Sequence, residues 1–366
     1  MPKASKYLLI GSTQAYSGKS ATVLGLSYQL QQKGLDIAYG KPLGTCMSEH
    51  GGKEVEEDVQ LIAGSLGLPE NRVAPMVLAL DEVTVQKRLR GEDKADYQQS
   101  LAKYRQMSFG DLVLLEGPGD LEEGYLFELS LLQVAEVVDA AVLLVARYKS
   151  LLSIEGVLSA KQRVGDRLIG IIVNDIPTAQ LQTANSTIRP FLEQQGIPVL
   201  GMLPKNELLR SVSVRELVNQ LNAEVLACSD RLDLMVESLA IGAMNVNAAV
   251  KYFRKRRNMA VVTGGDRVEI QQAALETSTQ CLILTGQFPP PPFIVARAEE
   301  LEIPILSVEL DTLTTVEIID RTFGQVRVHE PIKVECIRHL MATYFDVDRL
   351  LSQLGLTLSE LKPGKL

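Results

Sequence analysis

The stretch that decides the fold is Tyr7-Leu8-Leu9-Ile10-Gly11-Ser12-Thr13-Gln14-Ala15-Tyr16-Ser17-Gly18-Lys19-Ser20. An apolar run typical of a buried strand is followed by a loop that ends in Gly-Lys-Ser, and then by a helical segment that ends at Gly34. A loop between a strand and a helix can turn its backbone N–H groups and the positive end of the helix toward phosphate oxygens. We therefore predict a phosphate-binding loop, in which Lys19 contacts the β- and γ-phosphates and the Ser20 hydroxyl binds Mg²⁺.

The spacing of this loop departs from the usual phosphate-binding pattern. In G-x-x-x-x-G-K-[ST] the first glycine would occupy position 13, where this sequence has Thr13, and Gly11 lies two residues earlier. Gly18 is retained, and a side chain there would keep the backbone away from a phosphate. An ordinary turn between a strand and a helix is the alternative interpretation.

The first 205 residues alternate short β-type runs with helical stretches, which is typical of βαβ units and a mainly parallel sheet. Several runs are apolar at nearly every position, as expected where helices cover both faces of a sheet. The predicted fold class is therefore an α/β domain of the P-loop NTPase type. Its strands are expected at residues 7–10, 36–39, 112–115, 140–145, 168–173 and 199–203.

Polar residues follow several of these strands. Lys41 comes after the second strand, Glu116 ends the third, and Asn174 with Asp175 follows the fifth. Ligands of open α/β sheets bind at the carboxyl ends of the strands, so these side chains are expected at one site. The Glu116 carboxylate could hold Mg²⁺, and Asn174, with both a donor and an acceptor, could contact an adenine edge.

A second and smaller α/β domain is predicted beyond a boundary near residue 208. Its strands are expected at residues 259–262, 281–284 and 305–308, and its helices at 268–276 and 293–301. The predicted division is 1–208 for the nucleotide-binding domain, 209–345 for the second domain and 346–366 for a short helical tail.

The first domain resembles dethiobiotin synthetase and its relatives over about residues 5–205. The similarity lies in Gly18-Lys19-Ser20, Gly40-Lys41-Pro42, residues 111–117, Val173-Asn174 and residues 200–204. The resemblance implies ATP and Mg²⁺ as cofactors, with Ser20, Asp58 and Glu116 holding the metal and Lys19, Lys41 and Glu116 acting on the transferring phosphoryl group. The nucleotide-binding set that it implies comprises Thr13, Ser17, Gly18, Lys19, Ser20, Ala21, Asn174 and Pro204.

The second domain is similar to the DRTGG domain over about residues 212–322, for example at Thr263-Gly264-Gly265-Asp266-Arg267. Asp266 could there cap the following helix, or the loop could receive an anion. The two domains in this order resemble the N-terminal regulatory half of long bacterial phosphate acetyltransferases. Because the sequence stops at Leu366, before a transferase domain would begin, acetyl transfer by this chain is not expected.

Composition and charge restrict the class of partner. The formal net charge of −8 disfavours binding to nucleic acid and to anionic lipid. The apolar run at residues 140–146 is far shorter than the roughly 20 residues that span a bilayer, and the N-terminus shows no secretion signal. Four widely spaced cysteines are consistent with free thiols in a reducing compartment, so a cytoplasmic protein is expected.

Three functions remain open on the sequence. The first is an Mg-ATP-binding regulator or sensor linked to acetyl-CoA, acetyl phosphate or central carbon metabolism. The second is a ligase that uses ATP to activate a carboxylate or carbamate, as dethiobiotin synthetase does. The third is an accessory subunit of a separate phosphate acetyltransferase or other acetyl-CoA-pathway enzyme. A small metabolite is a further expected ligand, and the resemblance implies a homo-oligomer.

Overall fold

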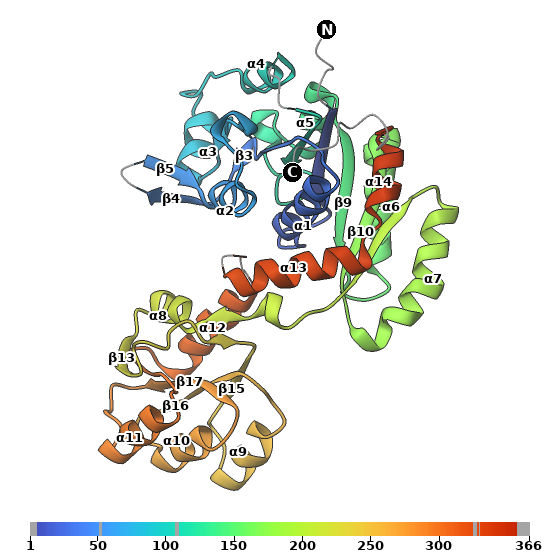
Figure 1. The fold of residues 1–366 in the computed structure, drawn as a ribbon. Coiled ribbons are helices and arrows are strands. Elements are labelled where there is room, and N and C mark those ends of the chain that lie inside the picture. The colour runs from blue at the N-terminus through green and yellow to red at the C-terminus, as the bar shows by residue number, and fades with distance from the viewer. Residues whose placement is uncertain (1–5, 51–52, 107–109, 325–327, 329, 357–366) are drawn as a thin grey trace. The chain divides into compact units, whose positions relative to one another are not determined.

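The computed structural model describes residues 6–50, 53–106, 110–324, 328 and 330–356 (Figure 1). The chain forms two compact units. The first unit comprises Met1–Lys205 together with Val328–Leu366, and the second comprises Asn206–Arg327. In sequence, the second unit is therefore inserted between two segments of the first.

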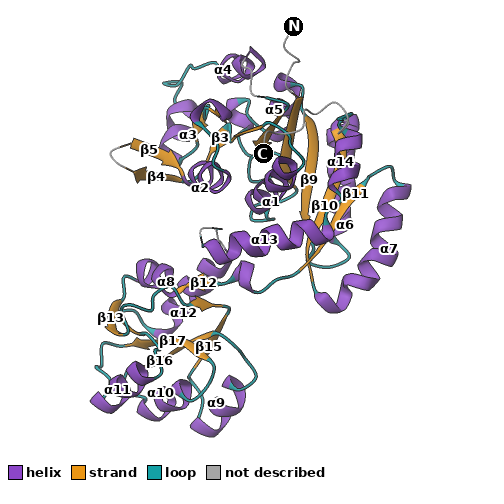
Figure 2. Ribbon diagram, in the orientation of Figure 1, coloured by secondary structure: helices purple, strands orange, loops and turns teal. Residues whose placement is uncertain are grey.

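A seven-stranded sheet forms the centre of the first unit, and all its strand pairings are parallel (Figure 2). The six strands predicted from the sequence are present, and the parallel α/β fold is confirmed. The seventh strand has only two residues, too few for an apolar pattern to reveal it. In sheet order the strands are β11 (Val199–Pro204), β10 (Leu168–Ile176), β9 (Ala141–Arg147), β1 (Lys6–Ser12), β8 (Leu112–Glu116), β2 (Ile37–Gly40) and β6 (Val73–Ala74).

Helices cover both faces of this sheet. On one face, Leu9 and Leu144 share a core cluster with residues of α5 (Leu131–Val138), α6 (Ser153–Val164) and α7 (Leu181–Gln194). Side chains alternate along a strand, so the buried Leu8 and Ile10 point to the opposite face. There α1 (Lys19–Gln32) contacts β1 and β8. Helix α1 therefore starts at the end of β1 and runs back along the sheet.

A segment between β2 and β8 adds small elements near the carboxyl end of β2. Two strands, β3 (Leu43–Gly44) and β7 (Leu78–Ala79), pair in parallel, and β4 (Met47–His50) forms a hairpin with β5 (Lys53–Glu56). Glu56 ends this hairpin and caps the next helix by accepting a hydrogen bond from the Val59 N–H. The helices of the segment are α2 (Glu57–Leu66), α3 (Glu82–Leu89) and α4 (Tyr97–Ala102).

The chain returns to the first unit as α13 (Pro331–Tyr344) and α14 (Val347–Gln353). Helix α13 packs on α1, where the Arg338 guanidinium lies 4.1 Å from the centre of the Tyr28 ring. Arg349 of α14 donates two hydrogen bonds, of 2.6 and 2.7 Å, to the Glu193 carboxylate of α7.

The position of this return segment differs from the predicted division of the chain. Residues 328–345 belong to the first unit instead of the second, and α14 packs on β10 and β11 instead of forming a separate tail. The first boundary lies at Lys205, three residues before the predicted 208. The local pattern of a helix does not reveal which surface it covers, because that depends on partners distant in the sequence, such as β10 and β11 for α14 and α1 for α13.

The second unit is a smaller α/β domain, as predicted. The strands are β12 (Val212–Ser213), β13 (Glu224–Ala227), β14 (Met235–Val236), β15 (Ser238–Ile241), β16 (Met259–Gly264), β17 (Thr279–Thr285) and β18 (Ile305–Val308). The helices are α8 (Val214–Leu221), α9 (Val246–Phe253), α10 (Val268–Leu275), α11 (Pro292–Glu300) and α12 (Thr312–Gly324). The main sheet has the order β13-β18-β17-β16-β15, with β13 antiparallel to β18 and the other pairings parallel. Helices α9, α10 and α11 share one core cluster with this sheet, and α8 and α12 share another.

Helix lengths bear on the question of a membrane span. Helices α1, α7 and α13 each have 14 residues. In the part of the chain that the structure describes, no helix combines the length and the apolar character that crossing a membrane requires.

We expect a methyl group at Gly25 to disturb the packing of α13 on α1. A Cβ atom there would lie 2.4 Å from Met341 Cγ, so Gly25→Ala should lower the free energy of unfolding by about 1–2 kcal/mol. The control is Gly64→Ala, because Gly64 also lies within a helix but has open space around it. This control should raise the free energy of unfolding by about 0.5–1 kcal/mol. Urea unfolding followed by circular dichroism measures both, and equal effects would contradict close packing at Gly25.

Candidate functional site

The loop between β1 and α1 has the backbone geometry that its glycine requires. Gly18 has a φ of +98°, in the left-handed region, and is the N-cap of α1 without any side-chain cap. The first hydrogen bond of the helix runs from the Thr22 N–H to the Gly18 carbonyl. The N–H groups of Lys19, Ser20 and Ala21 precede this bond and, as at any helix start, are free to point toward an anion. Thr13 lies half-buried in the loop.

Asn174 holds this loop from the neighbouring strand β10. Its Nδ2 donates a 2.9 Å hydrogen bond to the Ser17 carbonyl, and a Cβ atom at Gly18 would lie 2.6 Å from the same nitrogen. The sequence predicts that Asn174 contacts an adenine edge. The structure commits one of the two N–H donors of its amide to the loop, which leaves Oδ1 and the second N–H as the groups that could contact a base. Pro204 ends the adjacent strand β11, opposite Ile176.

Lys19 connects the phosphate-binding loop to the loop that follows β8. The residue is 9% exposed, and its Nζ donates to Ser12 Oγ at 3.1 Å and to the Gly119 carbonyl at 3.3 Å. Burial lowers the pKa of Lys19, and the nearby carboxylates of Glu116 and Glu123 oppose this effect. Both hydrogen-bond partners are neutral oxygens, which the ammonium could exchange for phosphate oxygens.

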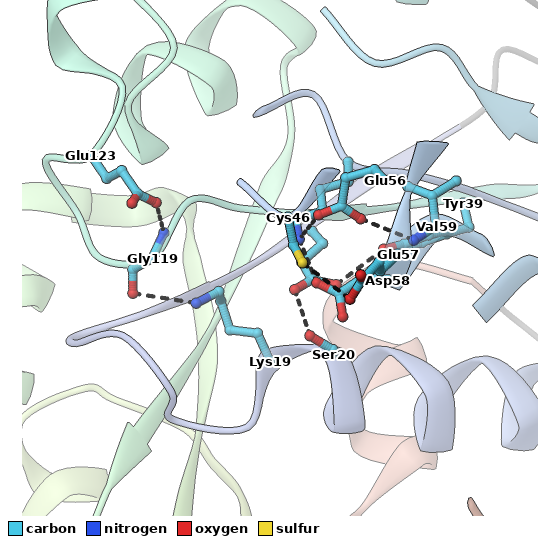
Figure 3. Close-up of polar contacts among 12 residues, drawn as sticks. Lys19, Ser20, Tyr39, Cys46, Glu56, Glu57, Asp58, Val59, Gly119 and Glu123 are labelled. Carbon is cyan, nitrogen blue, oxygen red and sulfur yellow. Dashed lines mark hydrogen bonds and ion pairs between the residues drawn. The ribbon is translucent and has the colours of Figure 1, made fainter. Parts of the chain in front are cut away.

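Glu116 is the buried carboxylate at the centre of the site, with 3% of the residue exposed. Its Oε1 accepts a 2.8 Å hydrogen bond from Ser20 Oγ, and its Oε2 accepts a 3.0 Å hydrogen bond from Tyr39 Oη (Figure 3). Burial raises the pKa of Glu116, while Lys41 and Lys19 act in the opposite direction. Burial and the surrounding carboxylates raise the pKa of Tyr39 well above its ordinary value, so its hydroxyl stays protonated and donates.

The pair of Ser20 and Glu116 fits a magnesium ion. Mg²⁺ in proteins takes one or two carboxylates and completes its octahedral shell with phosphate oxygens and water. The predicted hydroxyl and carboxylate ligands lie in direct contact, so one ion could bind both. Among the described residues, no cluster of three or more His, Cys, Asp or Glu side chains forms a metal site. The pair therefore suits a metal ion that arrives with phosphate groups.

Lys41 is held by two carboxylates. It follows β2, is 5% exposed, and its Nζ forms ion pairs with Glu56 and Asp58. Burial alone would favour the neutral amine, but the carboxylates of Glu116, Asp58 and Glu56 outweigh it and raise the pKa of Lys41. Lys41 is therefore protonated, and the carboxylates of Glu56 and Asp58 already balance its charge.

The charges of the site leave an excess of negative charge. Two ammonium groups, Lys19 and Lys41, are near four carboxylates, those of Glu56, Asp58, Glu116 and Glu123. In a buried site this excess favours a divalent cation and disfavours a phosphate without one. The electrostatics therefore select a metal-bound anion over a free one.

Two residues of the site were not predicted from the sequence. Glu56 is the first of three consecutive acidic residues, and the sequence alone does not show which of them turns toward Lys41. Tyr39 belongs to an apolar strand, where a tyrosine is indistinguishable from any other core residue. Asp58, predicted as a metal ligand, contacts Lys41.

The loop after β16 in the second unit shows whether Asp266 caps the helix that follows it. Arg267, and not Asp266, is the N-cap of α10, and no side chain caps that helix. The interpretation of Asp266 as an N-cap is therefore wrong. The Arg267 guanidinium donates to the carbonyls of Gly242 at 2.6 Å and Met244 at 2.7 Å, which fixes the loop to the one after β15.

Comparison with protein families identifies both units. A family described as the AAA domain matches residues 6–213, which is more than half of the chain. The chain belongs to this AAA-domain family. The DRTGG domain matches residues 216–322. A dethiobiotin-synthetase-like P-loop domain followed by a DRTGG domain, as predicted from the sequence, is confirmed.

The sequence of this AAA-domain protein is similar to part of a longer enzyme. A phosphate acetyltransferase of Synechocystis is 28% identical over 312 residues, which cover 80% of this chain and 44% of that enzyme. The uncharacterized protein YtoI of Bacillus subtilis is 34% identical over 134 residues, covering 36% of this chain and 30% of YtoI. The chain spans about half the length of the phosphate acetyltransferases that it matches.

One solved structure shares the DRTGG domain. It contains the CBS and DRTGG domains of the regulatory region of Clostridium perfringens pyrophosphatase, complexed with its activator diadenosine tetraphosphate. The similarity is 19% in sequence with a TM-score of 0.29, and covers 47% of this chain and 86% of the other.

We expect Glu56→Gln to destabilise the first unit strongly. The substitution removes one of the two charges that balance the buried Lys41 ammonium, which should lower the free energy of unfolding by about 2–4 kcal/mol. The matched control is Glu122→Gln, which removes a carboxylate from the exposed pair with Arg163 and should cost at most about 1 kcal/mol. Denaturant unfolding measures both.

The same measurement in a Lys41→Met background tests the origin of the effect. If Glu56 stabilises the fold through Lys41, Glu56→Gln should change the free energy of unfolding much less when the ammonium is absent. An undiminished loss in that background would contradict the ion pair as its cause.

Proposed function

We propose that this protein binds Mg-ATP at the loop between β1 and α1 and acts as a regulator or sensor in acetyl-CoA and acetyl phosphate metabolism. The observation that carries the proposal is the contact of Ser20 Oγ with the buried Glu116 carboxylate, next to Lys19. Acetyl transfer is not part of the proposed function of these two domains. The proposed site of action is the cytoplasm.

Binding of the nucleotide is supported by the loop geometry. In the proposed complex the N–H groups at the start of α1 and the Lys19 ammonium bind the phosphates, with Thr13 and Ser17 supplying the loop that surrounds them. Asn174 Oδ1 and the chain at Pro204 lie at the ends of adjacent strands, where a base would extend beyond the phosphates.

Magnesium is the metal that the donor set favours. Ser20 Oγ and a Glu116 oxygen would hold it, and the bound ion would neutralise part of the charge of the phosphates. Asp58 contributes negative charge to both Lys19 and Glu116, and so supports a cation there without the need for direct contact.

The pairing of Lys41 favours a binding function over phosphoryl transfer. A lysine that is already paired with two carboxylates presents less net positive charge to a transferring phosphoryl group. Here Glu56 and Asp58 both neutralise the Lys41 ammonium, and Glu56 is fixed in place as the cap of α2. Among the residues predicted to be catalytic, Lys19 and Glu116 are then left with roles in binding.

The link to acetyl phosphate metabolism comes from the relatives. Phosphate acetyltransferases match this chain over 80% or more of its residues, including both domains. We propose on this ground that a small metabolite of that pathway, or an enzyme that acts on it, is the partner to which nucleotide occupancy is communicated.

Titration calorimetry with ATP and ADP, in the presence and absence of Mg²⁺, tests the proposal. We expect Mg²⁺-dependent binding, weakened roughly 10- to 100-fold in Lys19→Ala because a charge-assisted contact is lost. The control is Lys251→Ala, which removes an exposed lysine from α9 of the second unit and should not change the affinity. Absence of nucleotide binding by the wild type would refute the proposal.

Phosphate release from the same samples separates binding from ligase chemistry. We expect negligible release, because Lys41 is neutralised. Release that rises when a carboxylate such as acetate is added would instead establish an ATP-dependent ligase, the alternative predicted from the sequence.

A homo-oligomer is also proposed. Exposed apolar side chains follow the carboxyl ends of β8 and β9, near the phosphate-binding loop: Tyr125 is 70% exposed, and Leu151 and Leu152 are 63% and 72% exposed. Apolar groups clustered at one edge of a sheet are typical of a surface that a partner covers. Light scattering should show a mass above 40.1 kDa for the wild type and the monomer mass for Leu151→Asp with Leu152→Asp; a monomeric wild type would refute the oligomer.

A further inference from the structure

We infer that Tyr39 is a positioning residue for the proposed metal site: its hydroxyl fixes the Glu116 carboxylate so that one oxygen is held and the other faces Ser20. The inference rests on the proposed Mg-ATP binding and extends it to a residue that touches neither nucleotide nor metal. The contacts that support it are the two hydrogen bonds to Glu116, one on each oxygen.

The sheet register brings Tyr39 and Glu116 together. Strands β2 and β8 are parallel neighbours, with Tyr39 opposite Leu114 and Gly40 opposite Leu115, so Glu116 lies just beyond them at the carboxyl edge. Tyr39 is wholly buried, and it is among the largest fully buried side chains. Because its ring is fixed by core packing, its hydroxyl is held at one position 3.0 Å from Glu116 Oε2.

A carboxylate in this position needs such a contact. The last torsion of a glutamate side chain has a broad and roughly two-fold preference, so the rotamer alone does not fix where the two oxygens point. Two ammonium groups, those of Lys41 and Lys19, attract the Glu116 carboxylate. With Tyr39 on Oε2, the carboxylate keeps Oε1 toward Ser20, where the proposed metal would bind.

The contact to Tyr39 can persist when a metal binds. The proposed metal would bind Ser20 Oγ and Oε1, which now share a hydrogen bond, whereas Oε2 is engaged on the side of the core. Partners of this kind, which hold a metal ligand without touching the metal, typically change metal affinity roughly 10- to 100-fold. Tyr39 should therefore determine how much Mg²⁺ the site needs.

Tyr39→Phe tests this inference by removing one oxygen atom and leaving the ring in the core. We expect the Mg²⁺ concentration that half-saturates binding of a fluorescent ATP analogue to rise roughly 10- to 100-fold. The matched control is Tyr7→Phe on β1 of the same sheet, where the buried hydroxyl donates a 2.7 Å hydrogen bond to the Tyr104 carbonyl and lies outside the site. This control should keep the wild-type Mg²⁺ requirement. Thermal unfolding should show a folded state for both variants.

A double-mutant cycle with Glu116→Gln shows whether Tyr39 acts through Glu116. If it does, Tyr39→Phe should not raise the Mg²⁺ requirement further in the Glu116→Gln background. Full additivity, or an equal rise in Tyr39→Phe and Tyr7→Phe, would overturn the positioning role. A wild-type Mg²⁺ requirement in Tyr39→Phe would overturn this inference alone, whereas a wild type that binds no nucleotide would refute the proposed function and the inference together.

Discussion

Buried charge at the carboxyl edge of the sheet is the constraint on which the candidate site depends. Glu116, Glu56 and Lys41 are each at most 5% exposed, and a lone ion in such a place would be far more stable in water. Each is stable here because the others are present: Lys41 pairs with Glu56 and Asp58, and Glu116 accepts from two hydroxyl groups. The site is therefore one network, in which the state of one group affects all the others.

The parallel sheet explains why these groups meet. Strands β1, β2 and β8 are neighbours that run in the same direction, so the residues that follow them gather at one edge. The start of α1 brings Ser20 to Glu116, and the junction of β5 with α2 brings Glu56 and Asp58 to Lys41. The same arrangement that predisposes the edge to receive a metal-bound phosphate also neutralises Lys41.

The packing on α1 gives this helix two different environments. Its first turn belongs to the phosphate-binding loop, and its middle packs against α13 at Gly25 and Tyr28. Since α13 returns from the inserted second unit, the helix that would bind phosphate is also the helix that receives the chain from the DRTGG domain.

The parallel α/β fold, the loop between β1 and α1 and the second α/β domain could all be predicted from the sequence. These follow from local patterns: apolar strand runs, Gly18-Lys19-Ser20 at a strand end, and polar residues such as Glu116 at the next strand ends. The fold itself was needed to show that Asn174 holds the loop, that Glu56 and Asp58 neutralise Lys41, and that Tyr39 contacts Glu116. It also decided that α13 and α14 belong to the first unit. The physical reason is the same in each case, because a local pattern records which residues are buried or polar but not which distant side chain each of them meets.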